Sequence, residues 1–388
     1  MPAASLTAET RIPVSILTGF LGSGKTTLLN HLLQDPAMAK CLVIINEFGE
    51  IGIDHLLVSV PSENMMLLNN GCLCCVLKGD LVDTFSEIHA KRSRGEIPWF
   101  DRVIVETTGL ADPVPVIQTI VTDEDICGNF RLELVATLVD GVHGAAQLGQ
   151  SAESVKQVAV ADTLLISKTD LASAAGLAGL RERLRKLNPG AHILDVHQGQ
   201  TPLDGLLGGA ARDAARRIEE IKRWQQLPQG HALHGHLDAH ADDRQDSHLL
   251  TFSLSYEGPI RSSAVALWLN MLANFLGADL LRVKGILNVE GEPVVIHIVQ
   301  TIVHEPTVLN QWPSDDRQSR IVFITRNIAR SQIEKTLEVF AVGESSVPSG
   351  PGLAIDPEVY ANFAKLARNF VLKTAIKRKD AKNANPLS

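Results

Sequence analysis

Three of the chain's five cysteines lie within four positions, in the segment NNGCLCCVLKGD at residues 69–80. Thiolates bind soft or borderline ions such as Zn²⁺, Cu(I) and Co²⁺. Side chains at i and i+2 of an extended segment point the same way, so Cys72 and Cys74 could chelate one ion, whereas Cys75 needs a local turn to join them. A redox switch is the competing interpretation, although a disulfide between adjacent cysteines is geometrically strained. The residues alone leave both open.

A phosphate-binding loop is predicted near the start of the chain, in IPVSILTGFLGSGKTTLLNHLL. It matches G-x-x-x-x-G-K-[ST], and it follows an apolar strand pattern at 12–17 and precedes a helical pattern, as that motif requires. Its glycines let successive backbone N–H groups point at phosphate oxygens. We expect Lys25 to reach the β- and γ-phosphates and the Thr26 hydroxyl to bind Mg²⁺. The predicted nucleotide-binding residues here are Gly19, Gly22, Ser23, Gly24, Lys25, Thr26 and Thr27.

A second motif, DRVIVETTGLADP, ends a buried strand pattern at Glu106. An acidic residue at the carboxyl end of a strand beside the phosphate loop is suited to hold Mg²⁺ or its water shell. Gly109 would let the backbone approach the γ-phosphate. We predict Lys25, Thr26 and Glu106 as the catalytic residues. The sequence assigns no residue to water activation, so we expect slow intrinsic hydrolysis.

The third motif, ISKTD, follows an apolar strand pattern at 163–166. P-loop GTPases carry Asn-Lys-x-Asp at this place, where the Asp accepts hydrogen bonds from guanine and the Lys stem packs along the base. Lys168 and Asp170 fit that pattern, and Ser167 replaces the usual Asn. Adenine lacks the matching donors, so the motif favours GTP over ATP.

The elements that must position these motifs alternate between strands and helices. Such alternation predicts an α/β fold, a P-loop NTPase with a mostly parallel sheet and helices on both faces, over residues 10–225. The predicted strands cover residues 12–17, 41–45, 65–68, 102–106, 132–139, 163–166 and 191–195.

After residue 225 the composition of the chain and its predicted structure change. A stretch at 226–248, QGHALHGHLDAHADDRQDSH and its neighbours, is rich in His and Asp and is predicted to be an exposed linker. Residues 249–342 show a strand, a helix, three strands and a helix, which predicts a smaller α+β domain. Residues 343–388 are predicted to form a flexible tail with a basic end.

Composition excludes several classes of protein. The 388 residues are 45% hydrophobic and 21% charged, with a net charge of −8, which is ordinary for a soluble globular protein. No apolar run reaches the roughly 18 residues of a membrane span, and the N-terminus lacks a secretory pattern. We therefore expect a cytoplasmic protein without membrane or nucleic-acid partners. Cytoplasmic thiols stay reduced, which favours metal binding or catalysis over disulfides.

Taken in order, the motifs GFLGSGKTTLLNHLL, INEFGEIGID, NGCLCC, VIVETTGLADP, SKTD and LLRVKGIL resemble those of CobW-type P-loop GTPases. That family is itself similar to the nickel-insertion GTPases of urease and hydrogenase maturation. The resemblance spans residues 11–342 and implies a GTP-dependent metallochaperone with a CobW-type C-terminal domain. It implies GTP, Mg²⁺ and Zn²⁺ as cofactors, with Co²⁺, Ni²⁺ or Fe²⁺ as alternatives, and a client metalloprotein as partner. Homodimer formation is left open.

With this resemblance, the cysteine cluster becomes the predicted cargo site. The segment NEFGEIGID resembles a switch region and offers Glu47, Glu50 and Asp54 to complete the coordination. We hypothesise that GTP tightens the site and that hydrolysis loosens it. The predicted transition-metal ligands are Cys72, Cys74, Cys75 and Glu50, and auxiliary ligands are predicted at His231, His234, His236 and His240.

Two other functions fit the same residues. One is a nucleotide-switched metal or redox sensor that delivers no metal. The other is a P-loop kinase or transferase in which the cysteines are incidental. Metal transfer to an apo-enzyme separates the first from a chaperone, and a phosphorylated product identifies the second.

Overall fold

The computed structural model describes residues 11–46, 57–62, 65–68, 73–76, 81–197, 200–201, 233–234, 249–277, 279–304 and 306–341. The chain divides into two compact units. Unit 1 comprises Met1–Arg217 with Leu237–Asp243, and unit 2 comprises Ile218–His236 with Arg244–Ser388. Within the described ranges, no helix is long and apolar enough to cross a membrane.

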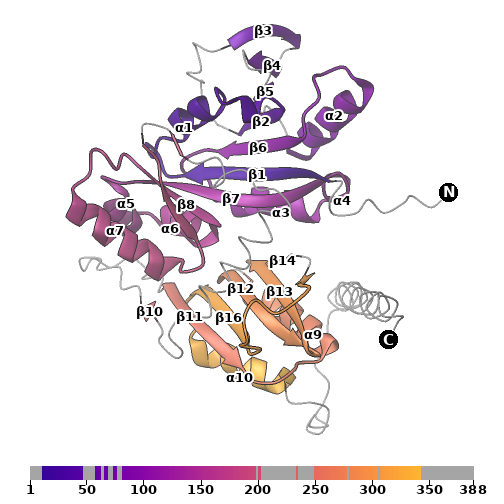
Figure 1. Ribbon diagram of the computed structural model, residues 1–388, viewed down its shortest axis with the longest axis vertical. Helices are drawn as coiled ribbons and strands as arrows, with labels where there is room; N and C mark the ends of the chain where they lie inside the picture. Colours follow the sequence, from indigo (N-terminus) through magenta and orange to yellow (C-terminus); the bar gives the residue numbers. More distant parts are fainter. Residues whose placement is uncertain are drawn as a thin grey trace, which may run out of the picture. The chain divides into compact units, whose positions relative to one another are not determined.

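Unit 1 is built on a nine-stranded sheet with the order β3-β4-β5-β2-β6-β1-β7-β8-β9 (Figure 1). The seven strands from β5 to β9 in this order are parallel, and β3 and β4 extend the edge in antiparallel fashion. The strands are β1 (Ile12–Gly19), β2 (Cys41–Asn46), β3 (Leu57–Ser62), β4 (Met65–Leu68), β5 (Leu73–Val76), β6 (Arg102–Thr107), β7 (Phe130–Asp140), β8 (Thr163–Ser167) and β9 (His192–Asp195).

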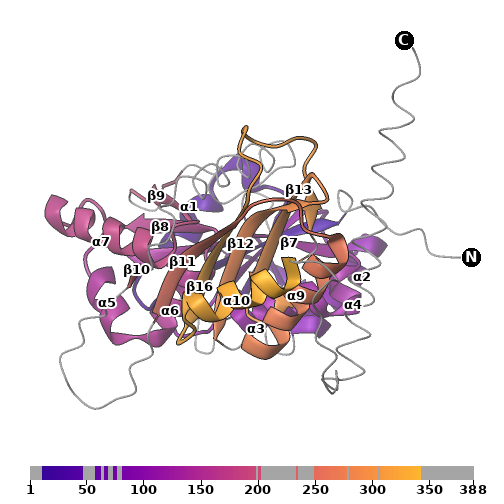
Figure 2. The same ribbon diagram turned by 90° about the horizontal axis from the view of Figure 1, so that it is seen from below.

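Helices cover both faces of this sheet. On one face, leucines of α1 pack with Val43 of β2 and Ile104 of β6. On the other face, Phe85 of α2 meets Phe130 of β7 edge to face, with ring centroids 4.8 Å apart, and α1 lies across the sheet from α3 and α6 (Figure 2). This confirms the predicted α/β fold. The helices are α1 (Lys25–Leu32), α2 (Leu81–Arg94), α3 (Val114–Thr122), α4 (Glu124–Cys127), α5 (Gly144–Gln150), α6 (Ala152–Val160) and α7 (Ala174–Leu187), with a 3₁₀ turn at Pro36–Met38.

Two strands of unit 1 are absent from the sequence-based prediction, β3 and β5. The β3 sequence LVSVPS contains a proline, and β5 is the four-residue LCCV of the cysteine segment. Short runs without a clear apolar alternation give little strand signal, and a proline demotes a run to an edge. The β5 backbone pairs with β2 through Val43↔Cys74 and Ile44↔Cys75. Two of the three clustered cysteines therefore belong to the nucleotide-binding sheet.

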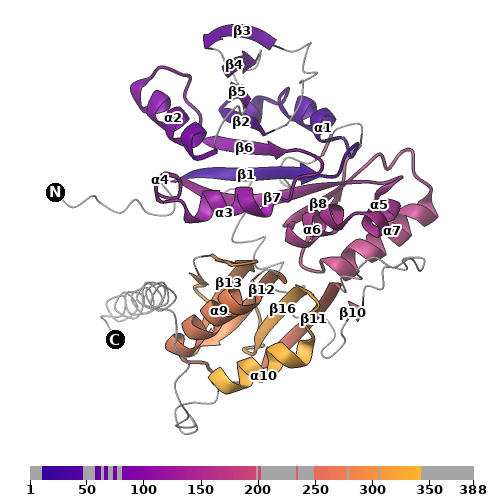
Figure 3. The same ribbon diagram turned by 180° about the vertical axis from the view of Figure 1, so that it is seen from behind.

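Unit 2 contains a separate antiparallel sheet with the order β10-β11-β16-β12-β13-β14, and β15 pairs with β13. Helices α9 and α10 lie together on one face (Figure 3). This confirms the predicted α+β domain. The elements are β10 (Leu233–His234), β11 (Leu249–Tyr256), α9 (Ser262–Leu276), β12 (Leu280–Val289), β13 (Glu292–Val299), β14 (Ile302–Val303), β15 (Thr307–Val308), β16 (Ser319–Arg326) and α10 (Arg330–Ala341).

An aromatic core joins the helices and sheet of unit 2. Trp268 of α9 is 1% exposed and packs edge to face on Phe323 of β16, which in turn stacks on Phe252 of β11. The indole Nε1 of Trp268 donates a hydrogen bond to the Thr336 hydroxyl of α10 over 3.0 Å. A buried indole requires such a partner. The same side chain therefore fills the core and fixes α9 against α10.

Candidate functional site

The predicted phosphate loop connects β1 to α1, and its backbone requires glycine at three places. Gly19, Gly22 and Gly24 have φ angles of 146°, 73° and 95°. A Cβ on Gly19 would also lie 2.5 Å from the carbonyl oxygen of Leu138. Side-chain-bearing residues rarely adopt these angles. The loop therefore has the tight curl that directs backbone N–H groups inward in phosphate-binding loops.

Polar side chains of the loop differ in exposure. The Lys25 ammonium is buried and donates to the Gly19 carbonyl over 2.8 Å, which holds it against the loop. Ser23 is fully buried, and its Oγ has no hydrogen-bond partner among the described residues. Thr26 and Thr27, in the first turn of α1, are exposed. A buried hydroxyl without a partner is costly, so the loop fits an additional acceptor such as a phosphate oxygen.

The second motif adjoins the phosphate loop. Glu106 is 5% exposed at the carboxyl end of β6, opposite Leu17 of β1. The hydroxyl of the next residue, Thr107, donates to that of Thr18 over 2.8 Å. A Cβ on Gly109 would lie 2.7 Å from the backbone nitrogen of Leu21, so only glycine fits there. The structure thus brings Glu106 and Gly109 to the loop, as the motifs predict.

The third motif is joined to the phosphate loop by two hydrogen bonds. Lys168 has a left-handed φ of 54°, and its ammonium donates to the Gly22 carbonyl over 2.8 Å. The Ser167 hydroxyl donates to the Ser23 carbonyl over 2.6 Å. Serine at the usual Asn position therefore retains a brace to the loop. Asp170 is exposed, which leaves its carboxylate accessible.

Asp140, at the end of β7, contacts the third motif and is not among the residues predicted from the sequence. It is 1% exposed, receives the Lys168 ammonium over 2.6 Å, and accepts from the backbone nitrogens of Val142 and His143. Burial acts to raise the pKa of Asp140, but the hydrogen bonds from Lys168 and the two backbone groups outweigh it and hold that pKa below 3.8. Its sequence signal was available, because LVDG ends a buried strand in an acidic residue, as VIVE does at Glu106.

The predicted metal ligands fall largely outside the described residues. Cys74 and Cys75 lie in β5, whereas Cys72 and Glu50 are outside. Of the predicted auxiliary histidines, His234 lies in β10, and His231, His236 and His240 are outside the described parts. Among the residues that the structure does describe, no group of three or more His, Cys, Asp or Glu could hold a metal ion. The metal site stays a prediction.

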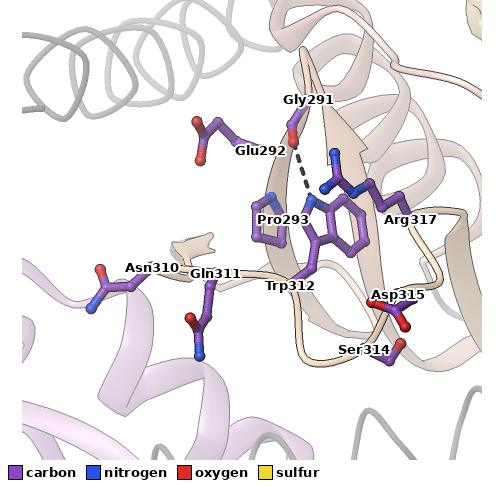
Figure 4. Close-up of a pocket in the computed structure, with 9 residues that line it drawn as sticks. All are labelled: Gly291, Glu292, Pro293, Asn310, Gln311, Trp312, Ser314, Asp315 and Arg317. Carbon is purple, nitrogen blue, oxygen red and sulfur yellow. Dashed lines mark hydrogen bonds between the residues drawn. The ribbon is translucent and has the colours of Figure 1, made fainter.

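A pocket in unit 2 lies where the β12–β13 turn meets the loop before β16 (Figure 4). Its volume is about 400 Å³, and the Trp312 indole closes one side by donating to the Gly291 carbonyl over 3.1 Å. None of the predicted site residues lines it. The lining residues are Gly291, Glu292, Pro293, Asn310, Gln311, Trp312, Ser314, Asp315 and Arg317.

Comparison with known families accounts for both units. Residues 13–195 match the CobW/HypB/UreG nucleotide-binding domain, and residues 250–341 match the cobalamin synthesis protein cobW C-terminal domain. The first match covers the three nucleotide motifs and β5. The second covers the sheet of unit 2 from β11 onward, together with α9 and α10.

Relatives match along most of the chain. The zinc chaperone YjiA of Escherichia coli is 34% identical over 324 residues, which cover 83% of this chain and 96% of the relative. The zinc-regulated GTPase metalloprotein activator 1 of Saccharomyces cerevisiae is 29% identical and covers 86% and 85%. A crystal structure of Zn(II)-bound YjiA GTPase from E. coli superposes with a TM-score of 0.64 at 29% identity, over 85% of this chain and 99% of that one. This chain belongs to the CobW/HypB/UreG family of P-loop GTPases.

Proposed function

We propose that this GTPase carries a transition metal, zinc in the first place, to a client metalloprotein in the cytoplasm, and that GTP hydrolysis controls release. The observation that carries the proposal is the position of β5. Its residues Cys74 and Cys75 pair with β2, and β2 pairs with β6 through Ile45↔Glu106. The strand that bears the cysteines and the strand that bears Glu106 are separated by β2 alone. A movement at the nucleotide could therefore reach the cargo site through one intervening strand. The zinc chaperones among its relatives support the same conclusion.

The nucleotide site in this proposal uses the three motifs together. The phosphate loop receives the phosphates, Lys25 balances their charge, and the side chains of Lys168 and Asp170 read the guanine base. Thr26 and Glu106 would hold Mg²⁺, which supplies charge stabilisation at the β- and γ-phosphates. The phosphate-binding residues are Gly19, Gly22, Ser23, Gly24, Lys25, Thr26, Thr27 and Gly109.

The cargo site in this proposal consists of Cys72, Cys74 and Cys75, with Glu50 completing it in the GTP state. Three thiolates and a movable carboxylate suit a transferable ion better than a closed four-cysteine site. The Glu50 segment follows β2 directly along the chain. Coupling between metal and GTP must be reciprocal, so bound metal would raise GTP affinity by the factor by which GTP raises metal affinity.

Zinc titrations with and without GTP·Mg²⁺ test the cargo site, with Co²⁺, Ni²⁺ and Fe²⁺ as competitors. We expect Cys74→Ala to abolish the tight, GTP-dependent binding. Cys127→Ala is the matched control, because this partly exposed cysteine in α4 is remote from the motifs in sequence. Unchanged binding in Cys74→Ala would refute the cysteine site. Equal GTP affinity with and without zinc would refute the coupling.

Delivery is separated from sensing by a transfer assay. A zinc-loaded chain is mixed with an apo-metalloenzyme whose activity reports the metal it acquires, in the presence of GTP or of a non-hydrolysable analogue. A chaperone activates the client faster with GTP. A sensor releases no metal to the client in either state.

A further inference from the structure

Gln157 in the middle of α6 holds the loop of the second nucleotide motif. Its side chain is fully buried. The amide nitrogen donates two hydrogen bonds, to the carbonyl of Gly109 over 3.2 Å and to that of Ala111 over 3.0 Å. These carbonyls lie 48 and 46 residues earlier in the chain. One side chain therefore fixes two peptide units of the segment that follows Glu106.

The same loop is held on both of its sides. On one side, Gly109 approaches Leu21 of the phosphate loop so closely that a Cβ would lie 2.7 Å from its backbone nitrogen. On the other, Lys156, the neighbour of Gln157, forms an ion pair with Asp112 over 2.9 Å. Helix α6 thus contacts the loop through two consecutive residues, and the loop contacts the phosphate loop through Gly109.

The chemistry of this contact requires an amide. Both bonds use N–H donors on carbonyl acceptors, and the other end of the amide, Oε1, is buried without a hydrogen-bond partner among the described residues. A carboxylate of the same shape would bring a charged acceptor against two carbonyl oxygens, and an apolar side chain would leave both carbonyls unsatisfied. The helix itself is held to the sheet, because the Thr137 hydroxyl of β7 donates to the main-chain carbonyl of Gln157 over 2.8 Å.

We propose that Gln157 is a positioning residue for recognition of the γ-phosphate. By holding the carbonyls of Gly109 and Ala111 towards α6, it keeps the Gly109 backbone against the phosphate loop, where a third phosphate would meet it. This inference rests on the proposed nucleotide site and adds to it a residue outside every motif. GDP lacks the third phosphate, so Gln157 acts on the preference for GTP over GDP and not on nucleotide binding as such.

The test compares affinities for GDP and for a non-hydrolysable GTP analogue, both with Mg²⁺, by fluorescence titration of the full chain. We expect Gln157→Glu to weaken binding of the GTP analogue about tenfold, the effect of losing a buried hydrogen bond or two, and to change GDP binding less than about twofold. Gln157→Met, which is uncharged and of similar length, is the second variant and is expected to show the same split.

Asn188→Ala is the matched control. Asn188 donates to the carbonyls of Val158, Ala159 and Ala161 at the end of the same helix, and none of these three hydrogen bonds goes to the loop. It should lower thermal stability without altering the preference for GTP. The proposal would be overturned if both Gln157 variants lost the same affinity for GDP as for the GTP analogue. It would also be overturned if these variants preferred the GTP analogue more strongly than the wild-type chain does. Failure of the wild-type chain to bind either nucleotide would instead refute the nucleotide site.

Discussion

The two sheets of this protein differ in where their buried polar side chains lie. In unit 1, buried polar side chains gather where parallel strands end, as with Glu106, Asp140 and Ser167. In unit 2, the antiparallel sheet and its two helices enclose an aromatic and aliphatic core around Trp268 and Phe323, and the buried cations Arg282 and Lys284 lie within strand β12, not beyond its end. Parallel strands bring their carboxyl ends to one edge, where loops from distant parts of the chain meet. The comparison assigns nucleotide chemistry to unit 1 and predicts that substitutions in the two units have different consequences.

The largest effect is expected at a pair of glycines, one in each sheet. Gly19→Ala places a Cβ 2.5 Å from the Leu138 carbonyl oxygen, and Gly285→Ala places one 2.6 Å from that of Arg320. Both are destabilising because no rotamer change relieves a clash with backbone. We expect Gly19→Ala to abolish measurable GDP binding. Gly285→Ala should lower the unfolding temperature of unit 2 and leave GDP binding within about twofold.

Gly179→Ala is a control for both, because its Cβ would point into open space on α7. Alanine favours a helix over glycine, so this change should be neutral or slightly stabilising. If Gly285→Ala weakened GDP binding as much as Gly19→Ala does, the division of roles between the sheets would be wrong.

Truncation of the aromatic core of unit 2 is expected to have the next largest effect. Trp268→Ala removes a 1%-exposed side chain and its hydrogen bond to Thr336, and should cost about 3–5 kcal/mol of unfolding free energy. Denaturant unfolding measures the loss, and GDP affinity should change little. Phe275→Ala, on the same helix but 75% exposed, is the control and should cost far less. Comparable losses in the two variants would contradict the assigned core.

A smaller and more specific effect is expected from Asp140→Asn. The amide keeps the size of the side chain but loses its charge beside Lys168, so GTP affinity should fall about tenfold, or roughly 1.4 kcal/mol. Asp195→Asn, which breaks a more exposed pair with Arg181, should change it less than about twofold. If Asp140→Asn and Asp195→Asn each lowered GTP affinity tenfold, Asp140 would have no special role in nucleotide binding.

Acid titration gives a second measurement on the same residue. The folded-state pKa of Asp140 is lowered, so its contribution to stability is present above the unfolded value of about 3.8 and is lost as the pH falls through the folded-state pKa. Asp140→Asn should therefore flatten the fall in stability below about pH 4. An unchanged acid profile would mean that the carboxylate contributes nothing through its charge.

Much of unit 1 could be predicted because its strands are long apolar runs that end in recognisable loops. Strand β3 was missed because a proline interrupts it, and β5 because it is only four residues long. Asp140 carried a signal at the end of its strand, but its partner Lys168 could not be read from the sequence, and Gln157 carried no signal at all. Each acts on a residue 28 to 48 positions away, and a single sequence does not show which distant side chains meet. The aromatic contacts of unit 2 are hidden in the same way.

One connection within unit 1 has a geometric consequence. The adjacent residues Ser167 and Lys168 donate to the adjacent carbonyls of Ser23 and Gly22. These two hydrogen bonds thus hold the loop that would read the base at a fixed spacing from the loop that would bind the phosphates. Because this spacing is fixed by hydrogen bonds within the protein, the proposed nucleotide site would select for the spacing between base and phosphates as well as for their chemistry.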